Sequence, residues 1–387
     1  MTKLFSILGS TGSIGITTLK ILRKKKLFKI NLLSADKNFN LICNQIKEFK
    51  PQIFLINNFN VFLKVKKKLK KCKTKIIYSK NFSYKSLKFS DVTLSAIPGI
   101  EGLEPTIEMV KKSRKLLIAN KESVICGWDL IKNVSKKSKT KLVPVDSEHF
   151  SIMQLIKNYK MRDIERIYLT ASGGPFLNKR GSQLKRIKPE QALRHPKWKM
   201  GKKITINSST LMNKIFELVE AEKIFNISNK KLNIIIHPES LVHAIIQLKN
   251  GLSHFVYHET SMAIPIANAI FDNQINVNNF YKVRKNNLKS LSFRKVDSKI
   301  FPMIKLKNKI FQFNSSPIII NAANEVLVDQ FLRKKIPFLS MYKMVLIVLR
   351  DRNYKKYAIK KPKTISQIKE ISEWVKGILF NKIKKNV

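Results

Sequence analysis

The chain has 387 residues, with 76 lysine and arginine residues against 25 aspartate and glutamate residues, a formal net charge of +51. Hydrophobic residues make up 44% of it, which is close to the globular average and excludes a disordered or fibrous protein. The length predicts two or three domains, and no uncharged apolar run approaches the ~20 residues of a membrane helix. Cys43, Cys72 and Cys126 lie far apart, without metal or disulfide spacing. We therefore expect a soluble, multidomain, cytoplasmic protein.

The positive charge has two readings. Clustered lysines neutralise phosphates, so a nucleic-acid-binding protein is one of them. The excess is mostly lysine and spread along the chain, and in Val61–Lys71 apolar residues recur at the spacing of an amphipathic helix with a solvated basic face. We favour a solvated basic surface without a specific nucleic-acid partner, and expect it to attract an anionic substrate.

Residues 1–145 alternate short apolar runs with helical patterns, which is typical of a doubly wound parallel sheet. This predicts an α/β fold that begins with a Rossmann-like domain. The strands are expected at Leu4–Leu8, Ile30–Leu33, Ile53–Ile56, Lys75–Tyr78, Val92–Ser95, Leu116–Ile118 and Leu142–Val145.

The rest of the chain divides by composition. Residues 146–270 contain all six histidines and several glycine-rich loops, so we expect an α+β catalytic domain with a flexible loop at 195–201. Residues 271–300 are rich in asparagine and lysine and predict a linker. Residues 301–387 predict a small helical domain.

Two helix starts stand out in this last segment. Proline favours the first turn of a helix, so Ser316-Pro317 predicts a helix that runs through Phe331. Thr364-Ile-Ser-Gln367 has the form of a capping box, with an apolar helical face behind it.

A glycine-rich turn, Gly9-Ser-Thr-Gly-Ser-Ile-Gly15, follows the first expected strand and opens a helix. Such a turn lets a backbone approach a pyrophosphate at a helix N-terminus, although an ordinary strand–turn–helix is the alternative. Asp36 lies 21 residues past Gly15, where an acid would accept a hydrogen bond from a ribose 2′-hydroxyl and favour NAD. Lys37 and Asn38 follow it and would suit a 2′-phosphate, so the residues leave NAD and NADP open.

Paired carboxylates follow the last expected strand of the first domain, in Val143-Pro-Val-Asp146-Ser-Glu148-His149. Alternate residues of an extended chain share a face, so Asp146 and Glu148 are able to converge on one hard cation. The alternative is a helix N-terminus with Asp146 or Ser147 as its cap.

A second polar cluster spans residues 206–217. Ser208–Thr210 predict a helix cap, after which Asn213 and Lys214 share a face with Glu217. This arrangement suits a phosphate and a third carboxylate, although a plain surface ion pair is the alternative.

Three turns complete the candidates. Leu169–Pro175, which contains Ser172, offers hydroxyl and amide groups to a phosphate, or is a plain glycine turn. His195–Gly201, with Trp198 and Met200, predicts a mobile lid, or a loop whose tryptophan packs on the surface. Ala119–Ser123 lies where a doubly wound sheet presents its ligand crevice, or is an ordinary helix start with Asn120 as cap.

Taken in this order, these pieces resemble the 1-deoxy-D-xylulose 5-phosphate reductoisomerase family. The resemblance spans nearly the whole chain, and its ordered set of motifs is highly specific. The matching segments are Gly9–Gly15, Ala119–Ser123, Val145–His149, Ser172–Phe176, His195–Gly201, Ser208–Glu217, His237-Pro238 and Asn321–Val326.

The resemblance implies a homodimer with an N-terminal NADPH domain, a central catalytic domain and a C-terminal helical domain. It implies a divalent cation, Mg²⁺ or Mn²⁺, on Asp146, Glu148 and Glu217, bound to the C2 ketone and C3 hydroxyl oxygens of a phosphorylated sugar. The carbon skeleton would rearrange by retro-aldol cleavage and aldol recombination. Hydride from NADPH would then reduce the aldehyde to 2-C-methyl-D-erythritol 4-phosphate.

The resemblance also assigns roles to single residues. The substrate contacts implied are Lys121, Ser147, Glu148, Ser172, His195, Trp198, Ser208, Asn213, Lys214 and Glu217, with Met200 beside Trp198 in the lid. The NADPH contacts implied are Thr11, Gly12, Ser13, Ile14, Lys37, Asn38, Asn120, Glu122 and Gly201. The chain departs from the family pattern at Asp36, Asn207 and Ala263, where the family usually has Gly, Asp and Arg.

A different oxidoreductase is the other reading of the glycine turn. A semialdehyde or homoserine dehydrogenase could share that turn, but would not need the acidic triad. Metal dependence therefore separates the two readings.

Overall fold

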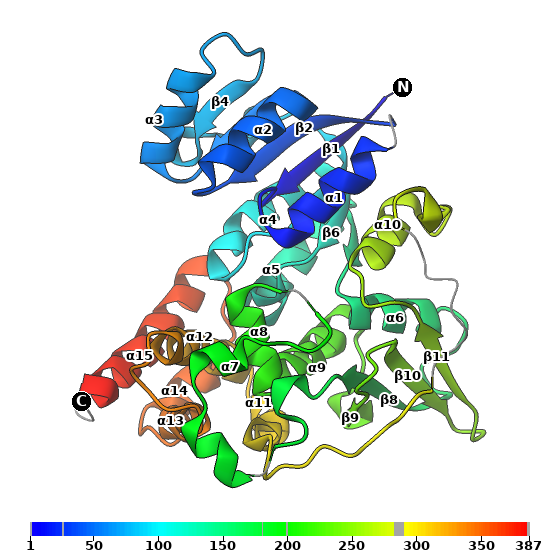
Figure 1. Cartoon of the computed structure of the whole chain (residues 1–387), viewed down its shortest axis with the longest axis vertical. Coiled ribbons are helices and arrows are strands. Elements are labelled where there is room, and N and C mark those ends of the chain that lie inside the picture. Colours follow the sequence, from blue (N-terminus) through cyan, green and yellow to red (C-terminus); the bar gives the residue numbers. More distant parts are fainter. Residues whose placement is uncertain (1, 25–26, 180, 199, 282–289, 385–387) are drawn as a thin grey trace. The chain divides into compact units, whose positions relative to one another are not determined.

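The computed structural model describes the chain except residues 1, 25–26, 180, 199, 282–289 and 385–387 (Figure 1). The chain folds into two compact units. The first consists of Met1–Ser123, Asp129–Asp146 and Ser261–Lys285, and the second of Val124–Trp128, Ser147–Thr260 and Asn286–Val387.

The first unit is built on a parallel sheet of seven strands in the order β4-β3-β2-β1-β5-β6-β7. This confirms the predicted α/β fold, and all seven predicted strands are present. Their bounds are β1 Lys3–Leu8, β2 Phe28–Ala35, β3 Ile53–Ile56, β4 Lys75–Tyr78, β5 Ser90–Ser95, β6 Ser113–Ile118 and β7 Lys141–Pro144. Central strand residues such as Ile7, Leu33 and Leu117 are fully buried, as expected where both faces of a sheet are covered.

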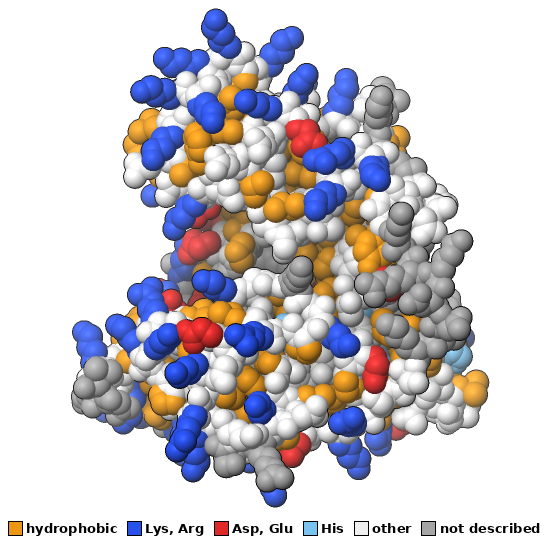
Figure 2. Space-filling model, viewed as in Figure 1, with side chains coloured by type: hydrophobic (Ala, Val, Ile, Leu, Met, Phe, Trp, Pro, Cys, Tyr) orange, Lys and Arg blue, Asp and Glu red, His pale blue; other side chains and the backbone are white. Residues whose placement is uncertain are grey.

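Helices connect and cover these strands. They are α1 Ser13–Arg23, α2 Phe39–Phe49, α3 Phe59–Lys68, α4 Leu103–Val110 and α5 Lys121–Ser138, together with α10 Ala263–Phe271. In α3, Val65 is buried while the lysines around it are exposed, which confirms the predicted amphipathic helix. On the face seen in Figure 2, lysine and arginine side chains are scattered rather than gathered in one patch.

Helix α10 lies in the first unit, not with the segment 146–270 in which the sequence placed it. It packs against α1, and the Lys115 ammonium donates to the Ala269 and Ile270 carbonyls at 2.9 Å each. A cation at the C-terminal carbonyls of a helix is favourable, so Lys115 holds this end to the sheet. Residues 271–281 of the expected linker continue this unit with a short 3₁₀ turn, and 282–289 lie outside the described residues.

The second unit contains a mixed sheet of four strands in the order β11-β10-β8-β9. Strands β8 and β9 are parallel, and the other two pairs are antiparallel. The bounds are β8 Ile164–Ala171, β9 Leu232–Ile236, β10 Val242–Leu248 and β11 Ser253–Tyr257. This sheet agrees with the α+β character predicted for the central segment.

Helices make up the rest of the second unit. They are α6 Ser147–Ile156, α7 Pro189–Ala192, α8 Lys202–Ser209, α9 Met212–Phe225, α11 Lys307–Ile310, α12 Ser316–Leu332, α13 Ser340–Leu349, α14 Tyr354–Ala358 and α15 Ile365–Lys384. The helical character of residues 301–387 is confirmed, but these helices share one compact unit with the central segment. Helix α12 is buried on nearly all sides and packs against α8, α9, α13 and α15.

Both predicted helix starts are present. Helix α12 begins at Ser316 with Pro317 in its first turn. At α15, the Thr364 hydroxyl accepts the Gln367 N–H at 3.2 Å, as in a capping box. The Gln367 side chain instead accepts the N–H of Lys363 at 2.6 Å, one residue before the expected partner. Among the described residues, no helix is both long and apolar enough to cross a membrane.

Candidate active site

The glycine turn connects β1 directly to α1, as predicted. Gly9 has a φ of +84°, and a Cβ there would lie 2.7 Å from the Ala96 carbonyl oxygen. A Cβ on Gly15 would lie 2.5 Å from the Gly9 carbonyl oxygen. Nothing comes closer than 3.5 Å to a Cβ on Gly12. The fold itself therefore requires Gly9 and Gly15, whereas Gly12 leaves one side of the turn open.

The N-terminus of α1 offers backbone N–H groups. Gly12 is its N-cap, and no side chain caps the helix. The first turn of such a helix carries unpaired donors and the positive end of the helix dipole, which together suit a phosphate. Thr11, Ser13 and Ile14 lie in or beside this first turn.

The residues after β2 are exposed. Asn38 caps α2, its Oδ1 accepting the Leu41 N–H at 3.2 Å, so its amide nitrogen remains as a possible donor to a ligand. The Asn57 amide reaches the Asp36 carboxylate at 3.5 Å. Lys37 lies between Asp36 and Asn38 and is exposed as well. One acid and two donors therefore lie together, as the sequence indicated.

Asn120 has the structural role that the alternative interpretation predicted. It caps α5, its Oδ1 accepting the Ser123 N–H at 2.7 Å. Its amide group donates to the Ile97 and Gly99 carbonyls, and the residue is buried. The following residues, Lys121 and Glu122, form the first turn of α5.

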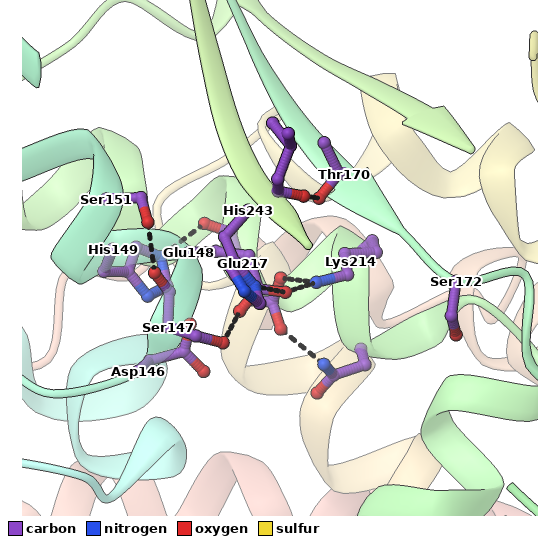
Figure 3. A network of polar contacts seen from close by, with 12 residues as sticks. Asp146, Ser147, Glu148, His149, Ser151, Thr170, Ser172, Lys214, Glu217 and His243 are labelled. Atoms are coloured by element: carbon purple, nitrogen blue, oxygen red, sulfur yellow. Dashed lines mark hydrogen bonds and ion pairs between the residues drawn. The ribbon is translucent and has the colours of Figure 1, made fainter. Parts of the chain in front are cut away.

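Three carboxylates converge as predicted. Asp146, Glu148 and Glu217 each bring one oxygen atom into a group in which all three lie within 4.8 Å of one another. The local reason differs from the predicted one, because the chain is not extended there. Asp146 directly precedes α6, and Glu148 lies in the first turn of that helix (Figure 3).

A lysine joins two of these carboxylates. The Lys214 ammonium donates to Glu148 at 2.5 Å and to Glu217 at 2.6 Å, and all three side chains are almost completely buried. Ser147 donates to the other oxygen of Glu148 at 2.6 Å, and Asn213 donates to the other oxygen of Glu217. Figure 3 shows this network between α6 and α9. The predicted common face of Asn213, Lys214 and Glu217 is confirmed, and it is buried rather than a surface pair.

The donor set determines which cation would fit. Three carboxylates supply only oxygen atoms, the ligands preferred by hard divalent cations such as Mg²⁺ and Mn²⁺. Lys121 lies 3.6 Å from Asp146 and adds a further positive charge. Two lysines thus balance part of the charge of the three acids, and the remaining negative charge suits a divalent cation.

The prediction that Ser208–Thr210 cap the second helix is wrong. Ser208 and Ser209 form the last turn of α8, and α9 begins only at Met212. Between them Leu211 has a φ of +67°, uncommon for a residue with a Cβ, and this turn redirects the chain. Only the Thr210 hydroxyl acts as expected, accepting the Met212 N–H at 3.3 Å.

Ser172 and His195 form a hydrogen-bonded pair whose proton positions follow from their partners. His195 Nδ1 accepts the N–H groups of Lys197 and Trp198, so the ring proton lies on Nε2, 3.0 Å from the Ser172 hydroxyl. That hydroxyl oxygen also accepts the Gly174 N–H at 3.1 Å. Its own proton is therefore left to donate to a ligand. Burial, with Lys214 nearby, lowers the pKa of His195 to about 4, so the imidazole is neutral near pH 7.

Three histidines around the carboxylates were not among the predicted site residues. His243 Nδ1 lies 4.0 Å from Glu148, and its ring stacks on His258 at 3.9 Å. His149 Nε2 lies 3.0 Å from the Glu217 carbonyl oxygen. The only signal in the sequence was the confinement of all six histidines to one segment. Trp198 of the predicted lid lies edge-on to His243, at 6.0 Å between ring centroids, and Lys199 of that loop lies outside the described residues.

A cavity of about 890 Å³ adjoins the residues that flank His195. Its lining includes Arg194 and Pro196, together with Pro175 and Phe176, which follow the glycines after Ser172. Three more basic side chains complete the charged part of this lining: Lys179, Lys185 and Arg186. Positive charge thus lines a cavity next to the segments that follow Ser172 and flank His195.

The parallel sheet with its glycine turn and the all-oxygen cluster define the chain as a Rossmann-like α/β protein with a candidate divalent-cation site. Three family models match it: "1-deoxy-D-xylulose 5-phosphate reductoisomerase" over residues 5–127, the C-terminal domain of the same enzyme over 142–225, and "DXP reductoisomerase C-terminal domain" over 258–378. The chain belongs to the 1-deoxy-D-xylulose 5-phosphate reductoisomerase family.

Individual relatives agree with this assignment. The reductoisomerase of Pelagibacter ubique is 42% identical over 96% of this chain and 97% of the relative, and that of a Wolbachia from Drosophila simulans is 40% identical over 89% of each. Among solved structures, the Zymomonas mobilis reductoisomerase in complex with NADPH has a TM-score of 0.87 at 27% identity, covering 99% of both chains. A reductoisomerase in complex with NADPH, fosmidomycin and magnesium has a TM-score of 0.90 at 28% identity, covering 99% of this chain and 98% of that one.

Proposed function

We propose that this protein converts 1-deoxy-D-xylulose 5-phosphate to 2-C-methyl-D-erythritol 4-phosphate, with NADPH as reductant and a divalent cation, in the synthesis of isoprenoid precursors. The observation that carries the proposal is the buried group Asp146, Glu148 and Glu217 with Lys214, in a chain whose relatives bear that enzyme's name. A semialdehyde or homoserine dehydrogenase would not need this group.

The cation would be held by Asp146, Glu148 and Glu217. Bound there, Mg²⁺ or Mn²⁺ supplies a Lewis acid and a template for two neighbouring substrate oxygens. The chain's own residues orient its ligands: Ser147 and Lys214 hold Glu148, while Asn213 and Lys214 hold Glu217. Supports of this kind preserve ligand geometry. A structure of a relative contains magnesium.

The cofactor would lie with its pyrophosphate at the glycine turn. The open side of Gly12 and the uncapped start of α1 support this placement. Lys37 and the Asn38 amide would hold the 2′-phosphate of NADPH. The remaining contacts proposed are Thr11, Ser13, Ile14, Asn120, Glu122 and Gly201, of which Asn120 would act through its backbone because its side chain is already fully hydrogen-bonded.

The substrate phosphate would be bound by side-chain hydroxyl groups whose protons are not already donated to an acceptor of the protein. Ser172 has a hydroxyl proton to donate, with the oxygen held by His195 and Gly174. Ser208 adds a second hydroxyl, and the basic cavity lining attracts an anion. Asn213 Oδ1 is buried and has no hydrogen-bond partner among the described side chains and backbone, so it suits a substrate hydroxyl. Trp198 and Met200 would close over the substrate and exclude water.

The test is NADPH oxidation, followed by absorbance, with purified protein and 1-deoxy-D-xylulose 5-phosphate, with and without Mg²⁺ or Mn²⁺. We expect loss of absorbance only when substrate and metal are both present, and none with Glu217→Ala. Product analysis by mass spectrometry identifies the methylerythritol phosphate. NADPH oxidation that persists in the presence of a chelator would favour a semialdehyde or homoserine dehydrogenase. No oxidation by folded, metal-loaded protein would contradict the proposal.

We further propose a cytoplasmic homodimer in which residues 1–145 bind NADPH and residues 146–270 carry the chemistry. Strand β11 lies at one edge of its sheet, and Leu252 and Phe255 beside and on it are about half exposed, which suits a protein interface. The three cysteines are free, as is usual in a reducing compartment. Light scattering should give twice the chain mass, and Phe255→Asp should lower it if this edge is the interface.

A further inference from the structure

Helix α8 is short, and most of the residues that it buries are polar. Of its eight residues, Thr205, Ile206, Asn207 and Ser209 are buried, so Ile206 is its one buried aliphatic side chain. Isolated helices of this length are marginal in water, and one aliphatic side chain provides little apolar burial. Its position must therefore depend on specific contacts with neighbouring elements.

Two such contacts join α8 to α12. The Lys203 ammonium donates to the Glu325 carboxylate at 2.9 Å, and both side chains are about two-thirds buried, at 27% and 36% exposure. One helical turn further on, the Asn324 amide donates to the Asn207 Oδ1 at 2.9 Å, with both residues buried. Neighbouring residues of α12 thus meet residues four apart on α8, which fixes both the rotation and the axial position of the short helix.

Helix α12 is a suitable support because it is the most completely buried helix of its unit among the described ones. A buried polar pair imposes one register, since sliding by a residue would leave its donors and acceptors unpaired. The Asn324 Oδ1 already lacks a hydrogen-bond partner within the described chain. The pair thus retains an unsatisfied buried atom, which points to a geometric requirement rather than to a contribution to stability.

We propose that Asn324 and Glu325 are positioning residues for the substrate's phosphate group. They act on α8 through Asn207 and Lys203, and so fix Ser208, which is half-exposed in the last turn of α8. The strained turn at Leu211 passes the same constraint to the start of α9, where Asn213 and Lys214 lie. This inference rests on the proposed function, and it assigns a role to a helical segment outside the predicted catalytic domain.

The ion pair is tested with Lys203→Ala, Glu325→Ala and the charge exchange Lys203→Glu/Glu325→Lys. Each single variant should raise the KM for 1-deoxy-D-xylulose 5-phosphate about tenfold with kcat changed less than about threefold, since misplacement of a binding group by a fraction of an ångström has effects of this order. The charge exchange should reverse most of the rise in KM that the single variants show. Glu325→Gln keeps the shape of the side chain and an acceptor oxygen, and its KM should be intermediate. It replaces Glu325→Ala in the test if that variant does not fold.

The matched control is Asp329→Ala. It removes the exposed pair of Asp329 with Arg333, at 2.9 Å, at the C-terminal end of α12, together with the hydrogen bond from the Gln330 amide, and so leaves the Lys203–Glu325 and Asn207–Asn324 contacts in place. Its KM should equal that of the natural chain. A rise in KM as large as that of Glu325→Ala, or a charge exchange no better than the single variants, would overturn the proposal.

The asparagine pair is tested by replacing amide donors with carboxylate acceptors. Asn207→Asp keeps an acceptor for the Asn324 amide and should keep the natural KM. Asn207→Asp/Asn324→Asp places two buried carboxylates face to face and should raise KM at least as much as Glu325→Ala does. Equal KM values for the single and the double variant would contradict the role of this pair.

Hydrogen exchange separates this inference from the proposed function. In the free protein, Glu325→Ala should speed exchange of the α8 amides, at residues 202–209, about tenfold, while α9 and α12 keep their rates. That readout requires no substrate. Unchanged exchange in α8 would refute the positioning of the helix, whereas faster exchange in a protein without reductoisomerase activity would refute the proposed function alone.

Discussion

The glycine turn of the first unit and the carboxylate cluster bind their proposed ligands in opposite ways. In the turn, the binding groups are backbone N–H donors of residues within seven positions of one another. The glycines contribute because they have no side chain that would block the close approach of the backbone. In the cluster, the binding groups are side chains up to 71 positions apart, Asp146 and Glu217, held by Lys214, Ser147 and Asn213. A site made of backbone groups therefore tolerates a change of side-chain type but not an increase in side-chain volume. A site made of side chains tolerates neither the loss of a charge nor the loss of a hydrogen-bonding partner.

The largest effect is expected where charge is removed from the cluster. Glu217→Gln keeps the shape of a fully buried side chain but removes one of three negative charges and the ion pair with Lys214. We expect kcat to fall on the order of 10³-fold, beyond the roughly 10–100-fold typical of residues that only support a ligand. Mn²⁺ binding, followed by electron paramagnetic resonance, should weaken in parallel.

Glu222→Gln is the control for that substitution, because it lies on the same helix and keeps its hydrogen bond from Asn229, which is 3.1 Å long in the natural chain. Burial raises the pKa of Glu222, so its charge is already disfavoured. Natural activity and Mn²⁺ affinity are expected for it. Comparable losses in both variants would show that the charge of α9, rather than the cluster, is what matters.

Added volume in the glycine turn is expected to have the next largest effect. Gly15→Ala places a methyl group 2.5 Å from the Gly9 carbonyl oxygen, so the turn must shift. We expect NADPH affinity, measured by fluorescence titration, to fall about a hundredfold and the melting temperature to fall by several degrees. Gly12→Ala meets nothing within 3.5 Å, so it should keep the melting temperature and weaken NADPH only. Equal melting temperatures for the two variants would contradict this division of roles.

A smaller effect is expected at Asp36, which is exposed and reached by Asn57 at 3.5 Å. A carboxylate accepts from the 2′-hydroxyl of NADH but repels the 2′-phosphate of NADPH. Asp36→Gly should therefore tighten NADPH binding about tenfold and leave NADH unchanged or weaker, each measured as a dissociation constant. A substitution that changed both cofactors equally would place Asp36 outside the ribose site.

A change of pH between 8 and 6 is expected to have the smallest effect on the site, because the His195 imidazole of the folded protein stays neutral over this range. Burial lowers its pKa to about 4, whereas the unfolded chain has an ordinary histidine near 6.5. Its contribution to stability is complete above pH 6.5 and is lost as the pH falls from 6.5 to about 4, because only the unfolded state then binds the proton.

Nuclear magnetic resonance of ¹⁵N-labelled histidine tests this directly. The His195 ring should show the proton on Nε2 and titrate near pH 4. In urea unfolding, the free energy of unfolding should fall less between pH 7 and pH 5 for His195→Asn than for the natural chain. A titration near pH 6.5 would contradict the neutral form and the donor assigned to Ser172.

Much of the fold could be predicted from local patterns. The seven strands of the parallel sheet, the helix at Ser316-Pro317 and the glycine turn depend on apolar runs, a proline and three glycines within short windows. Such features survive folding because each residue's preference agrees with its surroundings. The common face of Asn213, Lys214 and Glu217 was predictable for the same reason, as helical spacing alone places it.

Tertiary structure decided the rest. Helix α10 belongs to the first unit because Lys115, about 150 residues earlier, binds its last carbonyls, and no local pattern reveals that contact. Ser208 and Ser209 end one helix instead of starting the next, because α8 is anchored to α12 and the chain then turns at Leu211. His243 joins the carboxylates through the pairing of β10 with β8. The sequence by itself determined the local pieces, such as the glycine turn and the common helical face of Asn213, Lys214 and Glu217. Long-range packing decided which side chains meet, because partners distant along the chain are brought together only when the whole core is buried.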